Sequence, residues 1–288
     1  MAAPPLAFPP PEPAARRAAY RTRGRQRGPL ARLMSPSDAG ELVKPFVFLD
    51  FIDGSFGTQG GFDIHPHSGI ATVTFAFEGD IAYEDTTGQL GVLCSGGVEW
   101  LRASGGVWHD GGPTDRKARL HAFQLWVALP PEVENGPAQS RYLPPEDVPR
   151  LGPVRVLLGR YGNERSPIEL PSSMAYLAVR LKDGERWCHV PPPGHLVSWL
   201  AVAGGALRLP AADDAPAGKG EFVAFENGCE SIDLTAVGDT AFVFGSAVPH
   251  PYPLVLGHYS VHTSEAALDK GEAEIMRIGQ ELRRLGRR

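Results

Sequence analysis

The sequence predicts an all-β protein with two β-domains in tandem and one C-terminal helix. Glycine and proline are abundant, at 34 and 28 of 288 residues, which favours short strands separated by turns over a helical bundle. Hydrophobic residues make up 42% of the chain, enough for a core in each of two domains. Strand-like segments recur at short intervals in both halves, and only the end of the chain has a helical pattern.

The first half has its clearest strand signals at 42–52 and 70–77. Segment 42–52, LVKPFVFLDFI, is typical of a buried strand. Proline-rich 129–153 is interpreted as a linker between the domains. In 70–77, alternate residues share one face, which we expect to be the interior of a barrel: Ala71, Val73, Phe75 and Phe77. Further strands are predicted at 97–103, 121–130 and 153–161.

The second half repeats this pattern and ends in a different one. Thr263 is a candidate N-cap for a terminal amphipathic helix that we expect to pack on a sheet. Its apolar residues recur at helical spacing, and arginines follow near its end, where the helix dipole favours cations: Ile275, Ile278, Leu282 and Leu285, then Arg283, Arg284, Arg287 and Arg288. We predict one domain over 20–135 and a second over 136–288, with strand-rich segments at 174–187, 195–209, 220–228 and 231–248.

The N-terminal segment is rich in proline, alanine and arginine. Its prolines precede its arginines, the reverse of the order in a signal peptide. We interpret residues 1–19 as a solvated, disordered tail. A nucleic-acid or membrane arm and an organelle transit peptide stay open as alternatives.

Charge and cysteine content argue against several classes of protein. The 28 basic and 33 acidic residues give a formal net charge of −5, without the positive field typical of nucleic-acid binding. Cys94, Cys188 and Cys229 are far apart and form neither a disulfide framework nor a thiolate zinc motif. No apolar run approaches the roughly 20 residues of a membrane span. We expect a cytoplasmic monomer without a membrane or nucleic-acid partner.

Two histidines, His65 and His67, stand two residues apart in the segment GGFDIHPHSGI. In an extended chain, residues i and i+2 point to the same side, so both imidazoles can face one ion. If the register continues through Gly69, both lie on the predicted interior face of 70–77; a bulge there would shift it. His109, in a later glycine-rich turn, is a candidate third ligand. Three neutral imidazoles suit a divalent transition metal and leave positions open for substrate or dioxygen.

Six segments, taken in order, are similar to the landmarks of a known family. They are SPSDAGELVKPFVFLDF, FDIHPHSGIATVTFAFEG, YEDTTGQLGVL, SGGVEWLRASGGVWH, LHAFQLWVALP and LVLGHYSVHTSEAALDKGEAEI. Together they resemble the pirin family of the cupin superfamily, from about residue 20 to the C-terminus. The resemblance implies a bicupin: two tandem β-barrel (jelly-roll) domains that face each other, with a C-terminal helix packed back on them.

The resemblance also implies a metal centre in the first domain. Pirins hold an iron-type ion through the two histidines of the HPH segment, a third histidine on a later strand and a glutamate two residues after it. His65, His67 and His109 fill the histidine places, and the glutamate place falls on Gly111. Glycine can neither ligate the ion nor serve as base for a substrate hydroxyl. Ala71 is a second departure, because cupins often have a glutamate after the paired histidines.

Two other residues are candidates for a fourth ligand or for a hydrogen bond to a ligand. Asp110 is next to Gly111, although its side chain would project differently. His121 shares a face with Phe123 and Leu125, and a hydrogen-bonded core histidine is the alternative interpretation. Three histidines can hold a metal without a carboxylate. We therefore expect Fe(II) or another divalent transition metal; the alternative is a degenerate pocket that binds none.

Further polar residues have weaker signals. We expect Trp100 in the core and leave the place of Glu99 open; Glu84 and Asp85 fit a solvated or hydrogen-bonded loop. The late histidines lack the paired spacing, so they predict no second metal site: His250, His258 and His262.

Two main classes of function remain, and Gly111 leaves open whether the chain is an enzyme. The first is a quercetin 2,3-dioxygenase-like oxidoreductase that acts on a small flavonol-like aromatic substrate, as the resemblance implies. The second is a non-catalytic, metal- or redox-sensitive module that binds a regulatory protein partner. The same pocket could also serve an oxygenase or isomerase for an unrelated metabolite.

Overall fold

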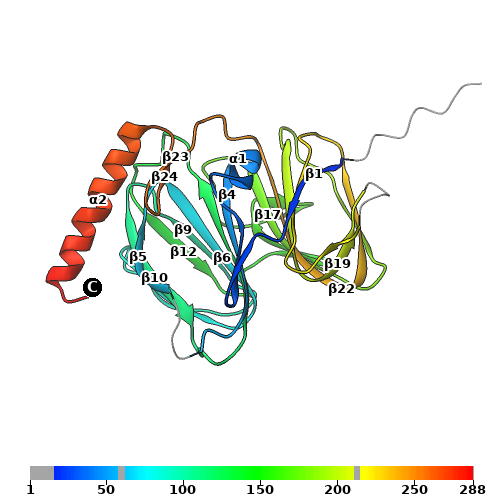
Figure 1. The fold of residues 1–288 in the computed structure, drawn as a ribbon, viewed down its shortest axis with the longest axis horizontal. Helices are drawn as coiled ribbons and strands as arrows, with labels where there is room; N and C mark the ends of the chain where they lie inside the picture. The colour runs from blue at the N-terminus through cyan, green and yellow to red at the C-terminus, as the bar shows by residue number, and fades with distance from the viewer. Residues whose placement is uncertain (1–15, 58–61, 211–214, 288) are drawn as a thin grey trace, which may run out of the picture.

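The computed structural model describes residues 16–57, 62–210 and 215–287. Two β-rich halves lie side by side, and helix α2 (Glu265–Arg284) runs along the outer side of the first half (Figure 1). The all-β class and the C-terminal helix predicted from the sequence are confirmed. Neither helix described has the length and hydropathy of a membrane span.

The first half consists of two antiparallel sheets. The smaller, four-stranded sheet has the order β5 (Phe62–His67), β10 (Val107–Pro113), β7 (Ile81–Asp85) and β8 (Leu90–Leu93). The seven-stranded sheet has the order β12 (Gln139–Leu143), β9 (Val98–Arg102), β6 (Ile70–Glu78), β11 (Leu120–Ala128), β4 (Phe46–Gly54), β3 (Leu30–Met34) and β2 (Arg25–Arg27). A short helix, α1 (Ala39–Val43), begins after the N-cap Asp38 and leads into β4.

The second half is built on one nine-stranded sheet. Its main path is β1 (Ala18–Thr22), β21 (Phe222–Phe225), β19 (Val197–Arg208), β22 (Ile232–Ala247), β17 (Met174–Leu181), β14 (Val154–Leu158) and β13 (Arg150–Leu151). Strand β18 (Arg186–His189) pairs with β22, and β20 (Ala217–Gly218) pairs with β19. Two small ribbons complete the fold: β15 (Arg160–Tyr161) with β16 (Glu164–Arg165), and β23 (Val255–Leu256) with β24 (Val261–His262).

The chain crosses between the halves near both predicted domain limits. Strand β1, blue in Figure 1, pairs with β21 of the second half. Arg16 is buried before it and donates hydrogen bonds to the carbonyl oxygens of Leu196 and Glu226. Conversely, β12 lies within the predicted linker and pairs with β9 of the first half. Residues 1–15 of the predicted tail lie outside the described residues, and the domain division at 135 stays a prediction.

The expectation that Ala71, Val73 and Phe75 face the barrel interior is wrong. These residues belong to the core cluster between the halves, together with Tyr176 and Trp199 of the second half. The seven-stranded sheet is buried on both faces, so alternation alone cannot tell which face is the interior. The opposite face of β6 points inward: Thr74 lines an internal pocket, and Ala76 packs with residues of the four-stranded sheet.

This shared core joins the halves through large buried side chains. Phe123 of β11 is fully buried and stacks on Phe51, with ring centroids 4.8 Å apart. Trp199 of β19 contacts Phe46 edge-on across the junction, at 5.4 Å. Each such buried side chain contributes about 1.5–3 kcal/mol to stability. The seven-stranded sheet therefore has a rigid backing, and the functional side chains lie on its inner face.

Helix α2 begins at the N-cap Ser264, one residue after the predicted cap Thr263. Ile275 and Leu282 are buried as expected, whereas Leu285 is 65% exposed. The Trp108 Nε1–H of β10 donates to the Ile275 carbonyl oxygen at 2.7 Å. The helix thus packs on the outer face of the four-stranded sheet.

Candidate metal centre

Strands β5 and β10 bring together the three histidines that the sequence analysis selected. In the antiparallel ladder His65 is opposite His109, and His67 is opposite Val107. His65 and His67 share a face because they are two residues apart. One ring nitrogen from each of the three histidines lies within 4.8 Å of the others.

Backbone carbonyls orient two of these rings. His65 Nδ1 lies 2.8 Å from the Asp63 carbonyl oxygen, and His67 Nδ1 lies 3.1 Å from that of Tyr259. A carbonyl only accepts, so each Nδ1 carries the proton and each Nε2 has a free lone pair. His67 Nε2 is buried without a hydrogen-bond partner, and His65 Nε2 lies 3.1 Å from His109 Nε2. In this contact His109 Nε2–H donates to the lone pair of His65 Nε2. The lone pairs of His65 and His67 still converge, and the buried, unpartnered nitrogen of His67 fits a metal ion.

Burial keeps the cluster neutral. It lowers the pKa of His67 to about 3, with a smaller contribution from neighbouring His65. Burial also lowers the pKa of His65, and it lowers that of His109 well below its ordinary value. At neutral pH all three rings are therefore neutral, the form that binds metals.

The turn after β5 is held against the C-terminal segment. Gly69 has φ +74°, and a Cβ there would collide with the Val261 carbonyl oxygen, so only glycine fits. Gly69 lies in the short connection between β5 and β6, which belong to different sheets, so the histidine register does not continue through it. Tyr259, whose carbonyl orients His67, has φ +69°, an uncommon conformation for a non-glycine residue.

Behind this turn lies a buried Ser68–His262–Glu134 chain. Ser68 Oγ is 3.0 Å from His262 Nε2, and His262 Nδ1 is 3.2 Å from Glu134 Oε2. Its order resembles a hydrolase triad, but Ser68 and His262 are almost completely buried, and Ser68 donates its proton to Ser260. These hydrogen bonds therefore fasten the turn after His67 to β24 and to Glu134.

His121 lies away from the cluster. Its Nε2 is 3.1 Å from the Ala203 carbonyl oxygen of the second half, and its ring packs near Phe51 and Phe77. The reason is the face reversal of the seven-stranded sheet: His121 shares a face with Phe123, which points to the junction. The structure thus agrees with the interpretation of His121 as a hydrogen-bonded core histidine, and not with a place beside the three histidines.

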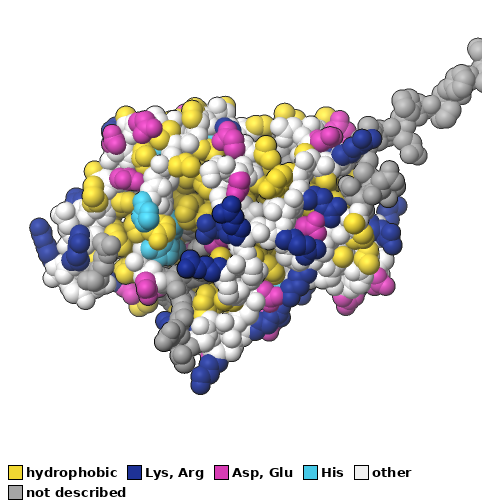
Figure 2. All heavy atoms as spheres, viewed as in Figure 1, with side chains coloured by type: hydrophobic (Ala, Val, Ile, Leu, Met, Phe, Trp, Pro, Cys, Tyr) yellow, Lys and Arg dark blue, Asp and Glu magenta, His cyan; other side chains and the backbone are white. Residues whose placement is uncertain are grey.

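An outer cleft of about 290 Å³ opens on one side of the histidines. The rings of Phe48 and Trp126, which line this cleft, stack face to face at 4.0 Å, and the His67 ring meets Trp126 edge-on. The Arg32 guanidinium lies 3.9 Å above the Phe48 ring and pairs with Asp50. Figure 2 shows histidine side chains at the surface of the first half, beside hydrophobic and basic groups.

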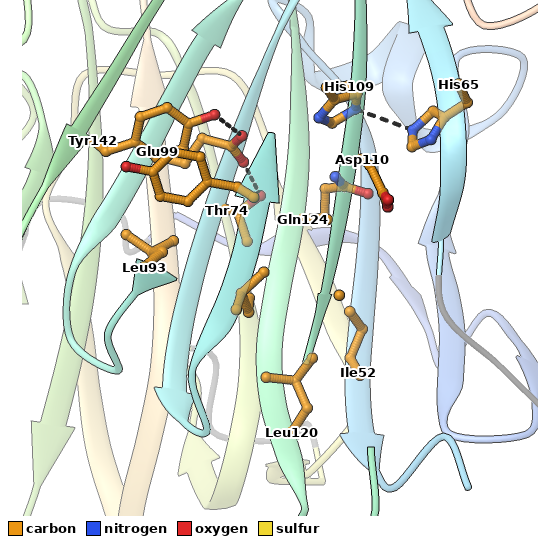
Figure 3. Close-up of a pocket in the computed structure, with 14 residues that line it drawn as sticks. Ile52, His65, Thr74, Leu93, Glu99, His109, Asp110, Leu120, Gln124 and Tyr142 are labelled. Carbon is orange, nitrogen blue, oxygen red and sulfur yellow. Dashed lines mark hydrogen bonds between the residues drawn. The ribbon is translucent and has the colours of Figure 1, made fainter. Parts of the chain in front are cut away.

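A smaller inner pocket of about 40 Å³ lies between the sheets, lined by His65, His109 and Glu99. Glu99 is buried and accepts hydrogen bonds from Thr74 and, at 3.3 Å, from Tyr142 (Figure 3). Burial raises the pKa of Glu99 from its ordinary 4.5 to about 7. Sequence reasoning left Glu99 open; its alternation with the core residue Trp100 was the signal that it points inward.

Tyr142 and Asp85 extend this polar group. The Tyr142 hydroxyl lies 3.0 Å from Asp85 Oδ2, and its ring stacks on Tyr83 at 3.5 Å. One phenol proton serves two carboxyl groups, so Asp85 and Glu99 compete for it. The sequence placed Tyr142 in a linker and Asp85 in a loop, and only the fold brings them together. Asp85 is buried and caps a turn through Thr87, as a hydrogen-bonded residue.

Residues 27–127 match the family model described as Pirin. Two candidate quercetin 2,3-dioxygenases of Pseudomonas aeruginosa are 30% identical over 190 residues and 36% identical over 185 residues. Over residues 27–127 this chain is a pirin. These alignments cover 61% and 59% of this pirin and 66% and 63% of the two relatives, a little under two thirds of their length.

Solved structures agree on the fold of this pirin. Quercetin 2,3-dioxygenase from Acinetobacter baumannii superposes with a TM-score of 0.82, over 92% of this chain and 98% of that chain, at 22% identity. Bacterial pirin YhhW from Escherichia coli, in complex with nickel(II), gives 0.62 over 82% and 98%, at 18% identity. At identities this low, the superpositions establish the fold alone. They confirm the predicted bicupin architecture.

The position two residues after His109 is occupied by Gly111, which has no ligating side chain. A Cβ at Gly111 would meet Ala82 O and Ile81 Cγ2 only at 3.9 Å, so there is room for a side chain. The neighbouring Asp110 is exposed and lines the inner pocket (Figure 3). Among the described residues, the close group of candidate ligand atoms consists of the three histidines without Asp110.

Proposed function

We propose that this pirin binds one divalent transition metal ion, with Fe(II) as first candidate, through His65, His67 and His109. The observation that carries the proposal is the buried, unpartnered Nε2 of His67, with a nitrogen of each other ring within 4.8 Å. When bound, the ion supplies a Lewis acid with open coordination positions. The neutral rings support divalent ligation, and the fold agrees with neighbours that include a nickel-bound pirin.

The substrate that we propose is a small hydroxyaromatic molecule of flavonol type, bound in the outer cleft and oxygenated there. At about 290 Å³ this cleft is much larger than the inner pocket of about 40 Å³. Trp126 gives its lining an aromatic, apolar side chain beside His67, which suits a planar ring. The names of the Pseudomonas relatives support the same substrate class.

Glu99 is our candidate for the proton acceptor that Gly111 cannot provide. It lines the inner pocket with His65 and His109, and its pKa of about 7 lets it hold or release a proton at neutral pH. Thr74 and Tyr142 keep its carboxyl group in place. We propose that the proton of the substrate hydroxyl passes into this pocket beside His65 and Gln124, which line both the inner pocket and the outer cleft.

Oxygen uptake with a flavonol such as quercetin tests the enzymatic proposal. Iron-loaded wild type should consume dioxygen and flavonol together, and Glu99→Gln should lower kcat by about 10²-fold or more, in the range of a general base. Glu132→Gln is the matched control, because it makes the same side-chain change at an exposed residue far from Glu99 in the sequence. Wild type that holds metal but gives no turnover would contradict the proposal.

A second candidate function is a non-catalytic metal-sensitive module with a regulatory protein partner, and Gly111 favours it. One variant, Gly111→Glu, distinguishes the two functions, and the structure has room for its side chain. If Gly111→Glu restores turnover that wild type lacks, the wild-type centre binds metal without catalysis. We place either function in the cytoplasm, because the three cysteines are all free, which suits a reducing compartment.

A further inference from the structure

The register of the second half gathers three arginines on one face of its sheet. Arg150 of β13 is directly opposite Arg155 of β14, and Arg155 is opposite Ala178 of β17. Arg180 is two residues beyond Ala178, so it lies on the same face. Like charges directly opposite in a sheet are destabilising. Sheet pairing therefore does not explain why arginines occupy these positions.

All three arginines line a cavity of about 240 Å³ at the junction of the halves. Its other wall comes from the first half, through residues 75–77 of β6 and 95–96 after β8. Arg155 Nη1 donates to the Gly96 carbonyl oxygen at 3.2 Å and to that of Pro145 at 3.0 Å. Arg180 Nη2 donates to the Phe77 carbonyl oxygen at 3.4 Å. These hydrogen bonds hold the guanidinium groups of Arg155 and Arg180 in place across the junction.

No ion pair joins these arginines to a carboxylate within residues 16–57, 62–210 and 215–287. Other arginines of the chain do have such partners, as Arg32 has Asp50 and Arg119 has Asp53. The pKa of Arg155 is lowered by burial and then by the two neighbouring arginines, as expected where like charges crowd. The cavity therefore has positive charge that no described acidic side chain offsets.

We infer that this junction cavity binds a small multivalent oxyanion, a phosphate group either free or carried by a small molecule. Guanidinium groups present paired N–H donors that match phosphate oxygens. The cavity is large enough for such an anion, because a cavity of about 10–15 Å³ already holds a water molecule. It is a small pocket at the junction of the halves, on a chain with a net charge of −5, so a small anion suits it better than a nucleic acid. The inference does not rest on the metal centre.

Calorimetry and thermal unfolding of the purified chain test it, with inorganic phosphate and glycerol phosphate as probes and sodium chloride of equal ionic strength as reference. Both probes should bind saturably and raise Tm, and Arg155→Gln should weaken binding at least tenfold. Tighter binding of glycerol phosphate would assign the site to phosphorylated molecules, and tighter binding of inorganic phosphate to the free anion. Arg208→Gln, at an exposed arginine of β19, should bind like wild type.

Arg150→Gln gives a sharper readout, because it removes the like-charge pair with Arg155. Without phosphate this variant should be at least as stable as wild type, and with phosphate it should gain less in Tm. An arginine that only supports the fold would instead lose stability under both conditions.

Phosphate can also bind a metal ion held by the three histidines. If the junction cavity is the phosphate site, His109→Ala should bind phosphate as tightly as wild type does. Three results would overturn the inference: loss of binding in His109→Ala, equal Tm shifts in sodium chloride, or unchanged binding in Arg155→Gln.

Discussion

The two halves use their buried histidines differently. In the first half, His65 and His67 each give one ring nitrogen to a backbone carbonyl and keep the other for the cluster. In the second half, His195 contacts Ser173 at 2.9 Å through one nitrogen and Ser246 at 3.1 Å through the other. No nitrogen of His195 is left for a metal.

His189 of the second half shows that burial alone is also insufficient. Both of its ring nitrogens are buried without a hydrogen-bond partner, and burial lowers its pKa to about 4. Its ring packs against Phe244, with centroids 4.6 Å apart, inside an apolar region. Within the part of the chain that the structure describes, candidate ligand atoms converge only in the first half. What distinguishes a candidate metal centre is that several free nitrogens point to one place.

The largest effect that we predict on this contrast comes from Gly69, which lies in the turn after the candidate ligand His67. Gly69→Ala should lower the free energy of unfolding by about 3–5 kcal/mol, because positive φ and a backbone collision add their costs. Gly204→Ala on β19 is the matched control, since a Cβ there meets nothing within 4 Å. Chemical denaturation measures both. Equal losses would show that the first half does not depend on this turn.

A smaller effect is predicted for the inner pocket. The pKa of Glu99 is raised in the folded state, so its contribution to stability is present below the ordinary 4.5 and is lost as pH rises through about 7. Between pH 5 and pH 8, wild type should therefore lose on the order of 2 kcal/mol relative to Glu99→Gln. Urea unfolding at both pH values measures the difference. Parallel pH profiles for the two proteins would contradict the raised pKa.

The smallest predicted effect is a gain. Gly111→Glu should tighten binding of a divalent ion about tenfold, or about 1.4 kcal/mol, because a carboxylate offsets part of its charge. Gly112→Glu adds the same charge one residue later, where alternation directs the side chain to the other side of β10. Competition with a chelator measures both affinities. Equal gains would mean that the effect is general electrostatics and not ligation.

Local patterns predicted much of this molecule. Strand alternation and turn residues gave the all-β class, and helical spacing of Ile275 and Leu282 gave the terminal helix. The paired spacing of His65 and His67 predicted two members of the candidate site, because residues two apart in a strand always share a side. These features depend on neighbours in sequence, so the sequence alone contains them.

Features that depend on pairing of distant strands could not be predicted. Which face of β6 is interior depends on the second half covering the other face. The same burial moved His121 to the junction, and it hid the partnership of Glu99 with Tyr142, 43 residues apart. The register that places Arg150 opposite Arg155 likewise appears only in the folded sheet.

Elemental analysis after loading with Fe(II) and removal of free ion tests the central claim most directly. Wild type should retain close to one metal per chain, and His65→Ala and His109→Ala should lose more than about 100-fold in affinity, beyond the 10- to 100-fold effect of residues behind a ligand. His195→Ala, which removes a buried histidine of the second half, should keep its metal. Negligible metal in wild type, or equal retention in all three variants, would contradict a three-histidine centre.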